Sequence, residues 1–564
     1  MTKRIIECVP NFSEGRNKQV IKQITDAIES VKGIRLLDVD AGEATNRTVV
    51  TFVGEPEAVV EAAFRGVRRA AEVIDMNIHH GAHPRMGATD VLPLIPVSGV
   101  TLQECAEMAR KLGRRIADEL HIPVYCYEAA ALRPERRNLA VCRKGEYEAL
   151  PERLDTADAP DFGDRPFDEG VARTGATAVG ARDFLIAVNF NLNTTSTRRA
   201  NAIAFDVREK GRPKREGGKP NGRPLKDENG NVIMLPGTLP GTKAIGWYID
   251  EYGIAQVSMN ITDISRTPLH KAFDEVSRAA AARGIRVTGT EIVGLVPKRA
   301  IVDAGRYFLH KQQRSTGLPE REIIRMAVKS MGLDELAPFN PDEKIIEYLI
   351  APRGGDRLID KTCRGFAEET AAESPAPGGG SVSAYMGALG AALGTMGANL
   401  SAHKAGWDDR WEEFSNYADG GQLLEERLLD LVDEDTAAFN RIMEALKLPK
   451  GTPAEQQARA RAMEEATLYA TQVPLRTMEA AYDVFDLCQA MTELGNPASV
   501  SDAGVGALAA RAAVLGAGLN VRINAAGLGD RAAADSLVAR ARDLEDKAIA
   551  REAEILAAVR GKIK

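Results

Sequence analysis

Two kinds of hydrophobic pattern alternate along the first 340 residues of the chain. Short runs of apolar and β-branched residues, such as "RLLDVD" at 35–40 and "TVVTFVG" at 48–54, predict β-strands. Segments with apolar residues three or four positions apart, such as 56–74 and 102–120, predict amphipathic helices. The order of these elements predicts two α/β subdomains, each with a βαββαβ pattern.

The pattern changes near residue 360, after which Ala, Leu, Glu and Arg dominate and few β-type runs remain. Helical segments separated by short turns predict a bundle. The predicted fold class is therefore α/β, with two βαββαβ-like subdomains, followed by an all-α helical-bundle domain. The predicted domains are residues 1–180, 181–333 and 361–564, with a linker at 334–360. A segment rich in Asp, Pro and Gly, 155–180, is predicted to be a loop between the two α/β subdomains.

Composition and charge are those of a soluble globular protein. Of the 564 residues, 44% are hydrophobic and 27% are charged, and the net charge is −7, so no basic excess indicates a nucleic-acid partner. The six cysteines form no CxxC pair, which is typical of reduced thiols in a cytoplasmic protein. Half of the residues in the uncharged segment 383–400 are Gly or Ala, which favours a packed helix over a membrane span.

A basic segment interrupts the second α/β subdomain at 208–231 and is rich in Gly, Pro and Asn. Its composition fits a solvated loop. An electrostatic guide for an acidic ligand is the alternative, because clustered positive charge attracts anions over several ångströms.

Two features of the helical region suggest chemistry. "SPAPGGGSVSAYMGALG" is a Pro/Gly turn that leads into a small-residue helix, whose free N–H groups suit an anionic or carbonyl ligand, although a plain helix start is the alternative. Asp435 lies in an apolar stripe of helical spacing, where a buried carboxylate is costly unless it is paired or neutral. It is a candidate proton donor and acceptor, or else a structural Asp satisfied by a helix cap or an arginine. The stripe consists of Leu428, Val432, Asp435, Phe439, Ile442 and Leu446.

Three of the seven histidines lie within five residues, in "HHGAHPRMG" at 79–87. His79 and His83 are four apart, as zinc ligands on a helix would be, but Gly81 and Pro84 oppose a helix there. No cysteine or carboxylate in this stretch completes a metal set. Metal binding and a structural role are therefore weaker interpretations than proton transfer by a loop histidine, whose pKa is ordinarily near neutral.

Longer motifs make the chain resemble a known family. "ECVPNFSEGRN", "LLDVDAGEATNRTVVTFVG", "HHGAHPRMGATDVLPLIPV" and "GEYEALPERL" resemble the formiminotransferase domain of the formimidoyltransferase-cyclodeaminase family. "SPAPGGGSVSA", "VDEDTAAFNRIMEALKLPKGTP" and "GLNVRIN" resemble its cyclodeaminase domain. The resemblance covers essentially the whole chain in the family's domain order. It assigns the two α/β subdomains to the transferase and the helical domain to the cyclodeaminase.

The resemblance implies two consecutive steps of histidine degradation. The formimino group of N-formimino-L-glutamate is transferred to N5 of tetrahydrofolate, and 5-formimino-tetrahydrofolate then cyclises to 5,10-methenyltetrahydrofolate with release of ammonia. Tetrahydrofolate, with or without a polyglutamate tail, is the co-substrate, and no metal is implied. The resemblance also implies a homo-oligomer in the cytoplasm, with no nucleic-acid or membrane partner.

By match to the family motifs, the catalytic residues are His83, Asp435, Asp40 and Glu128. His83 would move protons in the transfer step, with Asp40 and Glu128 as its partners, and Asp435 would move them in ring closure. Asn46, Arg47 and Arg85 would bind the carboxylates of the substrate. The residues implied for folate binding are Gly163, Asp164, Arg165, Pro166, Phe167, Arg173, Thr174 and Gly175.

Two rival functions remain open from the sequence. Similar helical domains act as methenyltetrahydrofolate cyclohydrolases, so the second domain could mainly hydrolyse the methenyl product. A folate-binding protein without catalysis is the other rival, and the presence of His83 and Asp435 speaks against it because storage needs neither.

Overall fold

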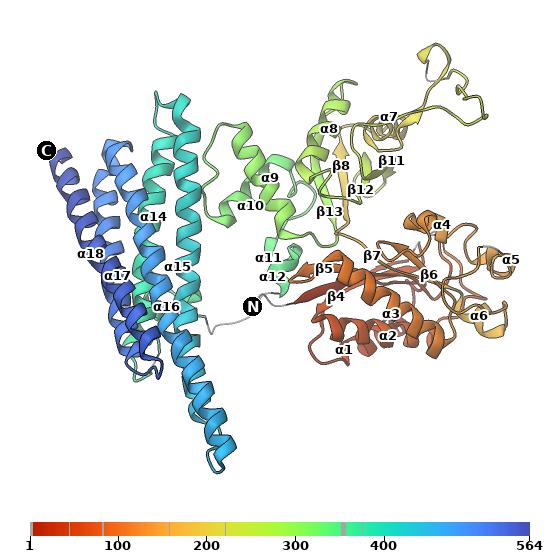
Figure 1. Cartoon of the computed structure of the whole chain (residues 1–564). Coiled ribbons are helices and arrows are strands. Elements are labelled where there is room, and N and C mark those ends of the chain that lie inside the picture. Colours follow the sequence, from red (N-terminus) through yellow and green to blue (C-terminus); the bar gives the residue numbers. More distant parts are fainter. Residues whose placement is uncertain are drawn as a thin grey trace. The chain divides into compact units, whose positions relative to one another are not determined.

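The computed structural model describes residues 4–43, 45–81, 84–156, 158–219, 221–350, 357–374 and 376–563. The chain divides into two compact units, residues 1–303 with 331–351, and residues 304–330 with 352–564. Sheets flanked by helices make up the first unit and helices alone the second (Figure 1). The predicted fold class, α/β followed by an all-helical region, is confirmed.

A seven-stranded sheet forms the first half of the α/β unit, with the strand order β1-β4-β2-β5-β7-β6 and β3 paired to β4. The strands are β1 (Ile5–Cys8), β2 (Asn11–Phe12), β3 (Arg35–Gly42), β4 (Arg47–Gly54), β5 (Thr89–Ser98), β6 (Val124–Glu128) and β7 (Thr177–Ala181). One face is covered by α1 (Lys18–Glu29), α2 (Pro56–Val73) and α3 (Leu102–Leu120) (Figure 1). The opposite face near β5 to β7 is covered by short helices that include α4 (Leu139–Cys142) and α5 (Leu150–Arg153).

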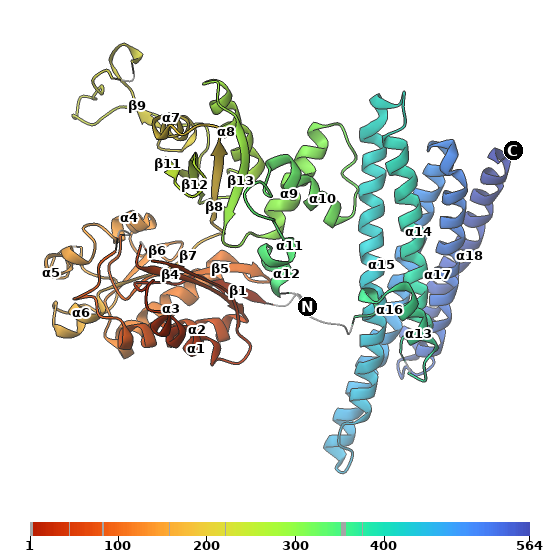
Figure 2. The ribbon, with the colours of Figure 1, turned by 180° about the vertical axis from the view of Figure 1, so that it is seen from behind.

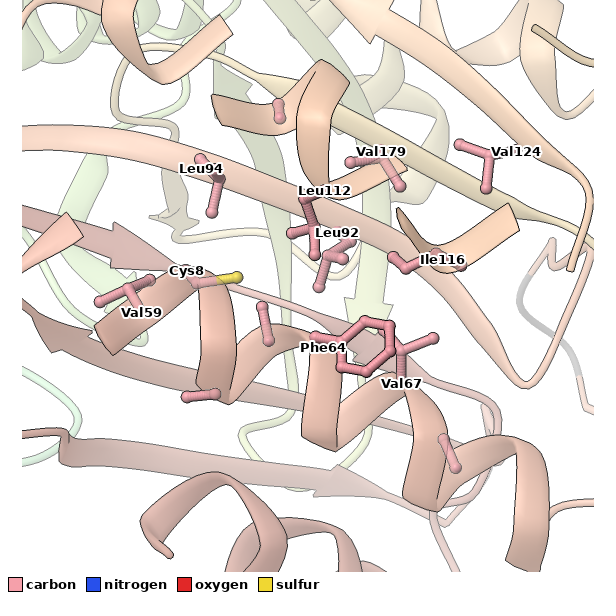
Figure 3. Close-up of a cluster of buried hydrophobic side chains, with 14 of the residues drawn as sticks. Cys8, Val59, Phe64, Val67, Leu92, Leu94, Leu112, Ile116, Val124 and Val179 are labelled. Atoms are coloured by element: carbon pink, nitrogen blue, oxygen red, sulfur yellow. The ribbon is translucent and has the colours of Figure 1, made fainter. Parts of the chain in front are cut away.

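The main core of this half lies between the sheet and its helices (Figure 3). Phe64 of α2, Leu112 and Ile116 of α3, and Leu92 and Leu94 of β5 are all buried there. Each such side chain contributes about 1.5–3 kcal/mol when it is fully buried. This packing holds β5 rigidly, and β5 begins directly after the histidine segment 79–87.

The prediction of a loop at 155–180 holds for the described residues up to 168 and is wrong from residue 169 on. The segment contains α6 (Glu169–Thr174) and most of β7, which pairs in parallel with both β5 and β6. All five residues of β7, "TAVGA", are buried. A strand of five small, fully buried residues shows no alternation, and it forms because two neighbouring strands supply its hydrogen bonds.

A four-stranded antiparallel sheet forms the second half of the α/β unit, in the order β11-β12-β8-β13. Its chain order, strand, helix, two strands, helix, strand, matches the predicted βαββαβ pattern. The elements are β8 (Ile186–Leu192), α7 (Thr197–Val207), β11 (Thr242–Ile249), β12 (Ile254–Ile261), α8 (Leu269–Ala281) and β13 (Val287–Val293). The basic segment precedes β11; it is largely exposed and contributes β9 (Arg212–Pro213) to a short pairing with β10 (Met234–Leu235).

The chain then passes through α9 (Lys298–Lys311) and α10 (Glu320–Met331). In the range predicted as a linker, α11 (Pro341–Lys344) and α12 (Ile346–Ile350) rejoin the α/β unit. A β-bridge joins Val296 to Ile345, and the N–H of Val296 donates to the carbonyl of Lys344 at 2.9 Å. Residues 351–356 lie outside the described residues.

Five long helices of the second unit lie side by side (Figure 2). They are α14 (Gly379–Ala402), α15 (Trp411–Leu446), α16 (Pro453–Glu493), α17 (Val500–Ala525) and α18 (Arg531–Lys562), and the shorter α13 (Cys363–Ala371) precedes them. Buried small residues let α14 and α17 approach closely, since a Cβ on Gly390 would lie 2.9 Å from the Gly506 carbonyl oxygen. Within the described ranges, one segment, Pro497–Ala525, is long and apolar enough to cross a membrane; half of its most apolar stretch is buried in the bundle.

The apolar stripe on α15 is buried only in part. Leu428 and Val432 are buried and Asp435 is half-buried, but the side chain of Leu446 is 42% exposed. The end of α15 and the start of α16 project beyond the neighbouring helices as a hairpin (Figure 1). The helical spacing correctly identifies one face of α15, yet it does not indicate where the bundle ends along that face.

Candidate active sites

A cavity of about 690 Å³ lies beside the histidine segment in the α/β unit. Its volume is within the range of small-molecule sites. The residues that line it include His80, Gly81, Pro84, Arg85, Arg143, Glu146, Glu148 and Lys243. Ala82 and His83 lie outside the described residues, so the predicted catalytic histidine is not placed. Its sequence neighbours Gly81 and Pro84 both line the cavity.

The histidine segment is tied to the segment predicted to bind folate. Gly87 and Gly175 form a β-bridge, and the N–H of Ala176 donates to the carbonyl of Met86 at 2.8 Å. A Cβ on either glycine would overlap backbone atoms of the other segment. The two glycines are therefore required by close backbone approach, and Gly175 also has φ +64°.

Asn46 holds the start of the histidine segment. Its side-chain oxygen accepts from the N–H of Gly15 and its amide donates to the carbonyl of His80, both at 3.0 Å. Nε2 of His79 lies 2.9 Å from the Asn46 carbonyl, a contact that needs the proton on Nε2. Burial lowers the pKa of His79, which favours the neutral ring. Asn46, predicted to bind substrate, thus has its amide engaged by the backbone.

Arg85 is already paired with carboxylates of the chain. Its Nη2 and Nη1 donate to the two oxygens of Glu148 at 2.7 and 2.9 Å, and Glu146 lies 3.4 Å from Nη1. Glu148 raises the pKa of Arg85, and Arg85 lowers the pKa of Glu148. The predicted substrate clamp can therefore hold a carboxylate bidentately, and it holds Glu148 in this structure.

Asp40, Arg47 and Glu128 lie on three strands of the same sheet. Asp40 is exposed on β3, and Arg47 begins the neighbouring β4. Burial lowers the pKa of Arg47, and Asp90 opposes this effect. Glu128 ends β6 with φ +53°, a conformation that non-glycine residues adopt rarely and often at functional sites. Burial raises the pKa of Glu128, while Lys243 on β11 lowers it.

Asp90 and Arg143 form a buried pair that the sequence interpretation missed. Asp90, the second residue of β5, is 1% exposed and accepts from Nε of Arg143 at 3.2 Å and also from its Nη2. The N–H of Met86 donates to the same carboxylate at 3.2 Å. Burial raises the pKa of Asp90, and Arg143 opposes the rise. A carboxylate inside the apolar strand "TDVLPLIPV" is the sequence signal that marks this site.

The residues predicted to bind folate lie just before α6, at its end and at its C-cap, Gly175. Arg165 donates to the carbonyl of His121 at 3.1 Å and pairs with Asp168, and Arg173 donates to the carbonyl of Glu72 at 2.8 Å. Phe167 makes an edge contact with Tyr147, their ring centroids 6.1 Å apart. The cavity lining includes none of the eight residues, all of which the structure describes. Their role in folate binding stays a prediction.

Asp435 faces the start of α14 in the helical unit. The hydroxyl of Ser381 lies 3.1 Å from its carboxylate, and a Cβ on Gly380 would overlap that carboxylate. A Cβ on Gly379 would lie 3.3 Å from the side-chain amide of Asn520, a residue of the "GLNVRIN" motif. Burial raises the pKa of Asp435, and hydrogen bonds from the Ser381 hydroxyl and backbone oppose the rise. Because Gly380 has no side chain, the Asp435 carboxylate can lie at the N-terminus of α14, where a negative charge is favoured.

The neighbours of Asp435 on α15 have other partners. Glu434 accepts from Arg476 at 2.8 Å and from Tyr469, and Asp433 accepts from the N–H of Leu358 at 2.6 Å. No lysine or arginine of the described ranges pairs with Asp435. A half-buried carboxyl without a cation is suited to exchanging protons. A group of three or more His, Cys, Asp or Glu that could hold a metal is absent from the part of the chain that the structure describes.

Family models match nearly the whole chain. Residues 5–182 match the formiminotransferase domain, N-terminal subdomain, residues 187–351 the formiminotransferase domain, and residues 362–543 the formiminotransferase-cyclodeaminase model. The formimidoyltransferase-cyclodeaminase of Mus musculus is 44% identical over 523 residues, which is 92% of each chain. The chain belongs to the formimidoyltransferase-cyclodeaminase family.

Single-activity relatives match each part of this formimidoyltransferase-cyclodeaminase family member separately. Glutamate formimidoyltransferase of Streptococcus pyogenes serotype M1 is 41% identical over 307 residues, 54% of this chain and 93% of the relative. Methenyltetrahydrofolate cyclohydrolase of Methylorubrum extorquens is 36% identical over 204 residues, 36% of this chain and 98% of the relative. The chain therefore joins in one enzyme two parts that occur as separate proteins.

Proposed function

We propose that the chain catalyses two consecutive folate reactions of histidine degradation. The first transfers the formimino group of N-formimino-L-glutamate to N5 of tetrahydrofolate. The second closes the ring of 5-formimino-tetrahydrofolate to give 5,10-methenyltetrahydrofolate and ammonia. The observation that carries the proposal is the match to a formimidoyltransferase-cyclodeaminase over 92% of both chains. An arginine-lined cavity and an unpaired carboxyl at a helix N-terminus support it.

In the transfer step, N5 must lose a proton as it attacks the formimino carbon, and the nitrogen of glutamate must gain one as it leaves. We assign both proton movements to His83, which takes the first proton and returns one to the leaving nitrogen. Asp40 and Glu128 would orient His83 or stabilise the cationic amidinium. Arg47 and Arg85 would bind substrate carboxylates, and the bidentate contact of Arg85 with Glu148 is a model for that interaction.

Asn46 supports this site in a different way from Arg85. Because its amide joins the Gly15 and His80 backbones, its effect on substrate binding would come from holding the histidine segment. The folate would lie along residues 163–175, which the Gly87–Gly175 bridge connects to the same segment.

In ring closure, N10 forms a bond to the formimino carbon, and the amino group on that carbon leaves as ammonia. One proton must therefore move from N10 to the leaving nitrogen. We assign this movement to Asp435, whose raised pKa brings its two protonation states closer to balance near neutral pH. Gly380 makes room for the carboxylate, and Ser381 holds it at the helix N-terminus.

The cyclohydrolase alternative keeps the same domain but changes its main reaction. The methenyltetrahydrofolate cyclohydrolase relative matches 36% of the chain at 36% identity, whereas the bifunctional relative matches 92% at 44%. The bifunctional assignment is therefore the stronger one. Chemically prepared 5-formimino-tetrahydrofolate separates the two, since only a cyclodeaminase releases ammonia from it.

The proposal includes a cytoplasmic homo-oligomer that needs tetrahydrofolate, with or without a polyglutamate tail, but no metal, nucleic acid or membrane. Five of the six cysteines are buried and all six are unpaired thiols, which supports a reducing compartment. Exposed apolar side chains on α17 support contact between subunits. They include Leu508, Leu519 and Ile523, which are 44%, 67% and 72% exposed.

A single assay tests the function. The purified chain is given N-formimino-L-glutamate and tetrahydrofolate, and methenyl absorbance and ammonia are followed together. We expect both to rise in equal amounts. Transfer without ammonia would leave only the first activity, and no reaction at all would contradict the proposal.

A further inference from the structure

Arg143 combines a buried anchor with a place in the cavity wall. It lines the cavity beside the histidine segment, and its side chain is 16% exposed. Its Nε and Nη2 both donate to Asp90, which is 1% exposed within β5. Among the described residues only Asp90 accepts hydrogen bonds from this guanidinium. The two N–H groups of Nη1 therefore donate to no described residue.

The other arginine of the cavity is held differently. Arg85 uses Nη1 and Nη2 to bind Glu148, whose side chain is 62% exposed. An incoming carboxylate must displace Glu148 before it can use these donors. Asp90, by contrast, approaches Arg143 from within the sheet, so its pairing leaves the outer edge of the guanidinium available. Arg143 is thus the arginine that is preorganised for an anion.

The rigidity of the anchor follows from its position. Asp90 lies in a strand whose next residues, Val91 and Leu92, are buried in cores on the two faces of the sheet. The Asp90 carboxylate also accepts from the N–H of Met86, which belongs to the histidine segment 79–87. The Asp90–Arg143 pair therefore joins the end of the histidine segment to the cavity wall.

The chemistry of the formimino donor fits this arrangement. N-formimino-L-glutamate carries two carboxylates, and a planar guanidinium binds a carboxylate with charge-assisted hydrogen bonds. We propose that Arg143 binds one carboxylate of the formimino donor and that Asp90 is the positioning residue that holds the guanidinium in place. This proposal rests on the transferase function proposed above.

Steady-state kinetics of the full chain test the proposal. Arg143→Gln should raise the KM for N-formimino-L-glutamate roughly ten- to a hundredfold, as expected for one lost hydrogen bond to a charged group. The KM for tetrahydrofolate should stay within about twofold of wild type. Arg143→Lys keeps the positive charge but loses the planar guanidinium with its paired N–H donors. It should therefore raise the KM for N-formimino-L-glutamate by a smaller factor than Arg143→Gln. Asp90→Asn should raise the same KM because the guanidinium loses its anchor.

Arg283→Gln is the matched control. The side chain of Arg283 is 19% exposed, close to the 16% of Arg143. Arg283 pairs with Asp206 and is not part of the cavity lining. Its substitution should lower the melting temperature and leave both KM values unchanged. If Asp90→Asn does not fold, the two Arg143 variants and calorimetric binding of the product L-glutamate still test the proposal.

Truncated substrates show whether a carboxylate is the group that Arg143 holds. N-formimino-4-aminobutyrate lacks the α-carboxylate, and N-formimino-2-aminobutyrate lacks the side-chain carboxylate. Wild type should lose affinity for both analogues, and Arg143→Gln should cause no further loss for the analogue that lacks the carboxylate bound by Arg143. The proposal would be overturned if Arg143→Gln lowered the affinity for the full substrate and for both analogues by the same factor. An unchanged KM for N-formimino-L-glutamate in Arg143→Gln would also overturn it. A wild-type chain that transfers no formimino group would instead overturn the proposed function.

Discussion

The hydroxyl oxygen of Ser381 lies 3.1 Å from a carboxylate oxygen of Asp435 and 2.8 Å from the carbonyl oxygen of Val432. A hydroxyl has one proton to donate. When Asp435 is ionised, Ser381 can donate to it; when Asp435 is protonated, it can donate to Ser381, whose proton then goes to Val432. Ser381 can therefore keep a hydrogen bond to Asp435 in both protonation states of the carboxyl.

Ser381→Ala should raise the pKa of Asp435 further, because it removes a hydrogen bond that favours the ionised form. If ring closure begins with ionised Asp435 as a base, the acidic limb of its pH–rate profile should move to higher pH. Ser383→Ala is the control, since Ser383 is equally buried on α14 and donates to the Gly379 carbonyl at 2.6 Å. An unmoved limb in Ser381→Ala, or the same shift in both variants, would contradict the prediction.

Replacing Asp435 should separate activity from stability. Burial raises its folded-state pKa above the unfolded value, so folding favours the protonated form. Below the unfolded pKa of about 4, the carboxyl is protonated in both the folded and the unfolded state, so its ionisation does not affect stability. As pH rises through the folded pKa, the buried carboxyl ionises and the folded state reaches its full loss of stability. Asp435→Asn and Asp435→Leu should therefore have a higher free energy of unfolding than wild type at pH 7. The difference in the free energy of unfolding should become smaller as the pH is lowered.

Both variants should also slow ammonia release by roughly 10²–10⁴-fold, as expected for a lost acid–base group. Formimino transfer should continue. Denaturant unfolding at several pH values and ammonia release from 5-formimino-tetrahydrofolate measure the two effects. An Asp435→Leu chain that still releases ammonia at the wild-type rate would rule out the assignment.

His83→Ala should reduce formimino transfer by roughly 10²–10⁴-fold and leave cyclodeamination intact. His79→Ala is the comparison, because His79 donates to the Asn46 carbonyl at 2.9 Å from a buried position. It should lower the melting temperature and affect transfer less. Loss of transfer on chelation, with stoichiometric metal in the purified chain, would favour a metal site instead.

Long amphipathic helices are predictable from the sequence, and short buried strands are not. The spacing of apolar residues in 102–120 predicts a helix, and the segment is α3, whose start is marked by a capping box between Thr101 and Glu104. β7 has neither alternation nor β-branched residues beyond Thr177 and Val179. It is a strand because β5 and β6 lie on both sides of it, which is tertiary information.

The candidate sites are predictable to different degrees. Asp435 stands out because a carboxylate breaks an apolar stripe, and the structure adds that it faces Ser381 at a helix N-terminus. Arg143 cannot be identified in the same way, since an isolated arginine in "VCRKGEYE" resembles any surface arginine. Its role depends on Asp90, which is 53 residues away in the sequence.

Gly175→Ala should destabilise the α/β unit more than Gly253→Ala. Both glycines have φ +64°, where an alanine costs about 1–2 kcal/mol. A Cβ on Gly175 would also overlap the Met86 carbonyl, whereas nothing lies within 4 Å of a Cβ on Gly253. Gly175→Ala should therefore lower the melting temperature further and reduce formimino transfer. Equal melting temperatures for the two variants would contradict the close backbone approach.

The α/β part should carry the transferase activity when the chain ends at residue 351, and should be weakened when it ends at residue 333. Ile345, Ile346 and Leu349 are buried, and each contributes about 1.5–3 kcal/mol when fully buried. Ile345 also forms the β-bridge to Val296 that joins α11 and α12 to the unit. Both fragments contain residues 304–330, so any difference between them in stability or activity comes from residues 334–351 alone.

Fragment 1–351 should transfer the formimino group and accumulate 5-formimino-tetrahydrofolate, since it lacks Asp435. Fragment 1–333 should melt at a lower temperature and transfer more slowly. Equal stability and activity of the two fragments would show that α11 and α12 do not support the unit.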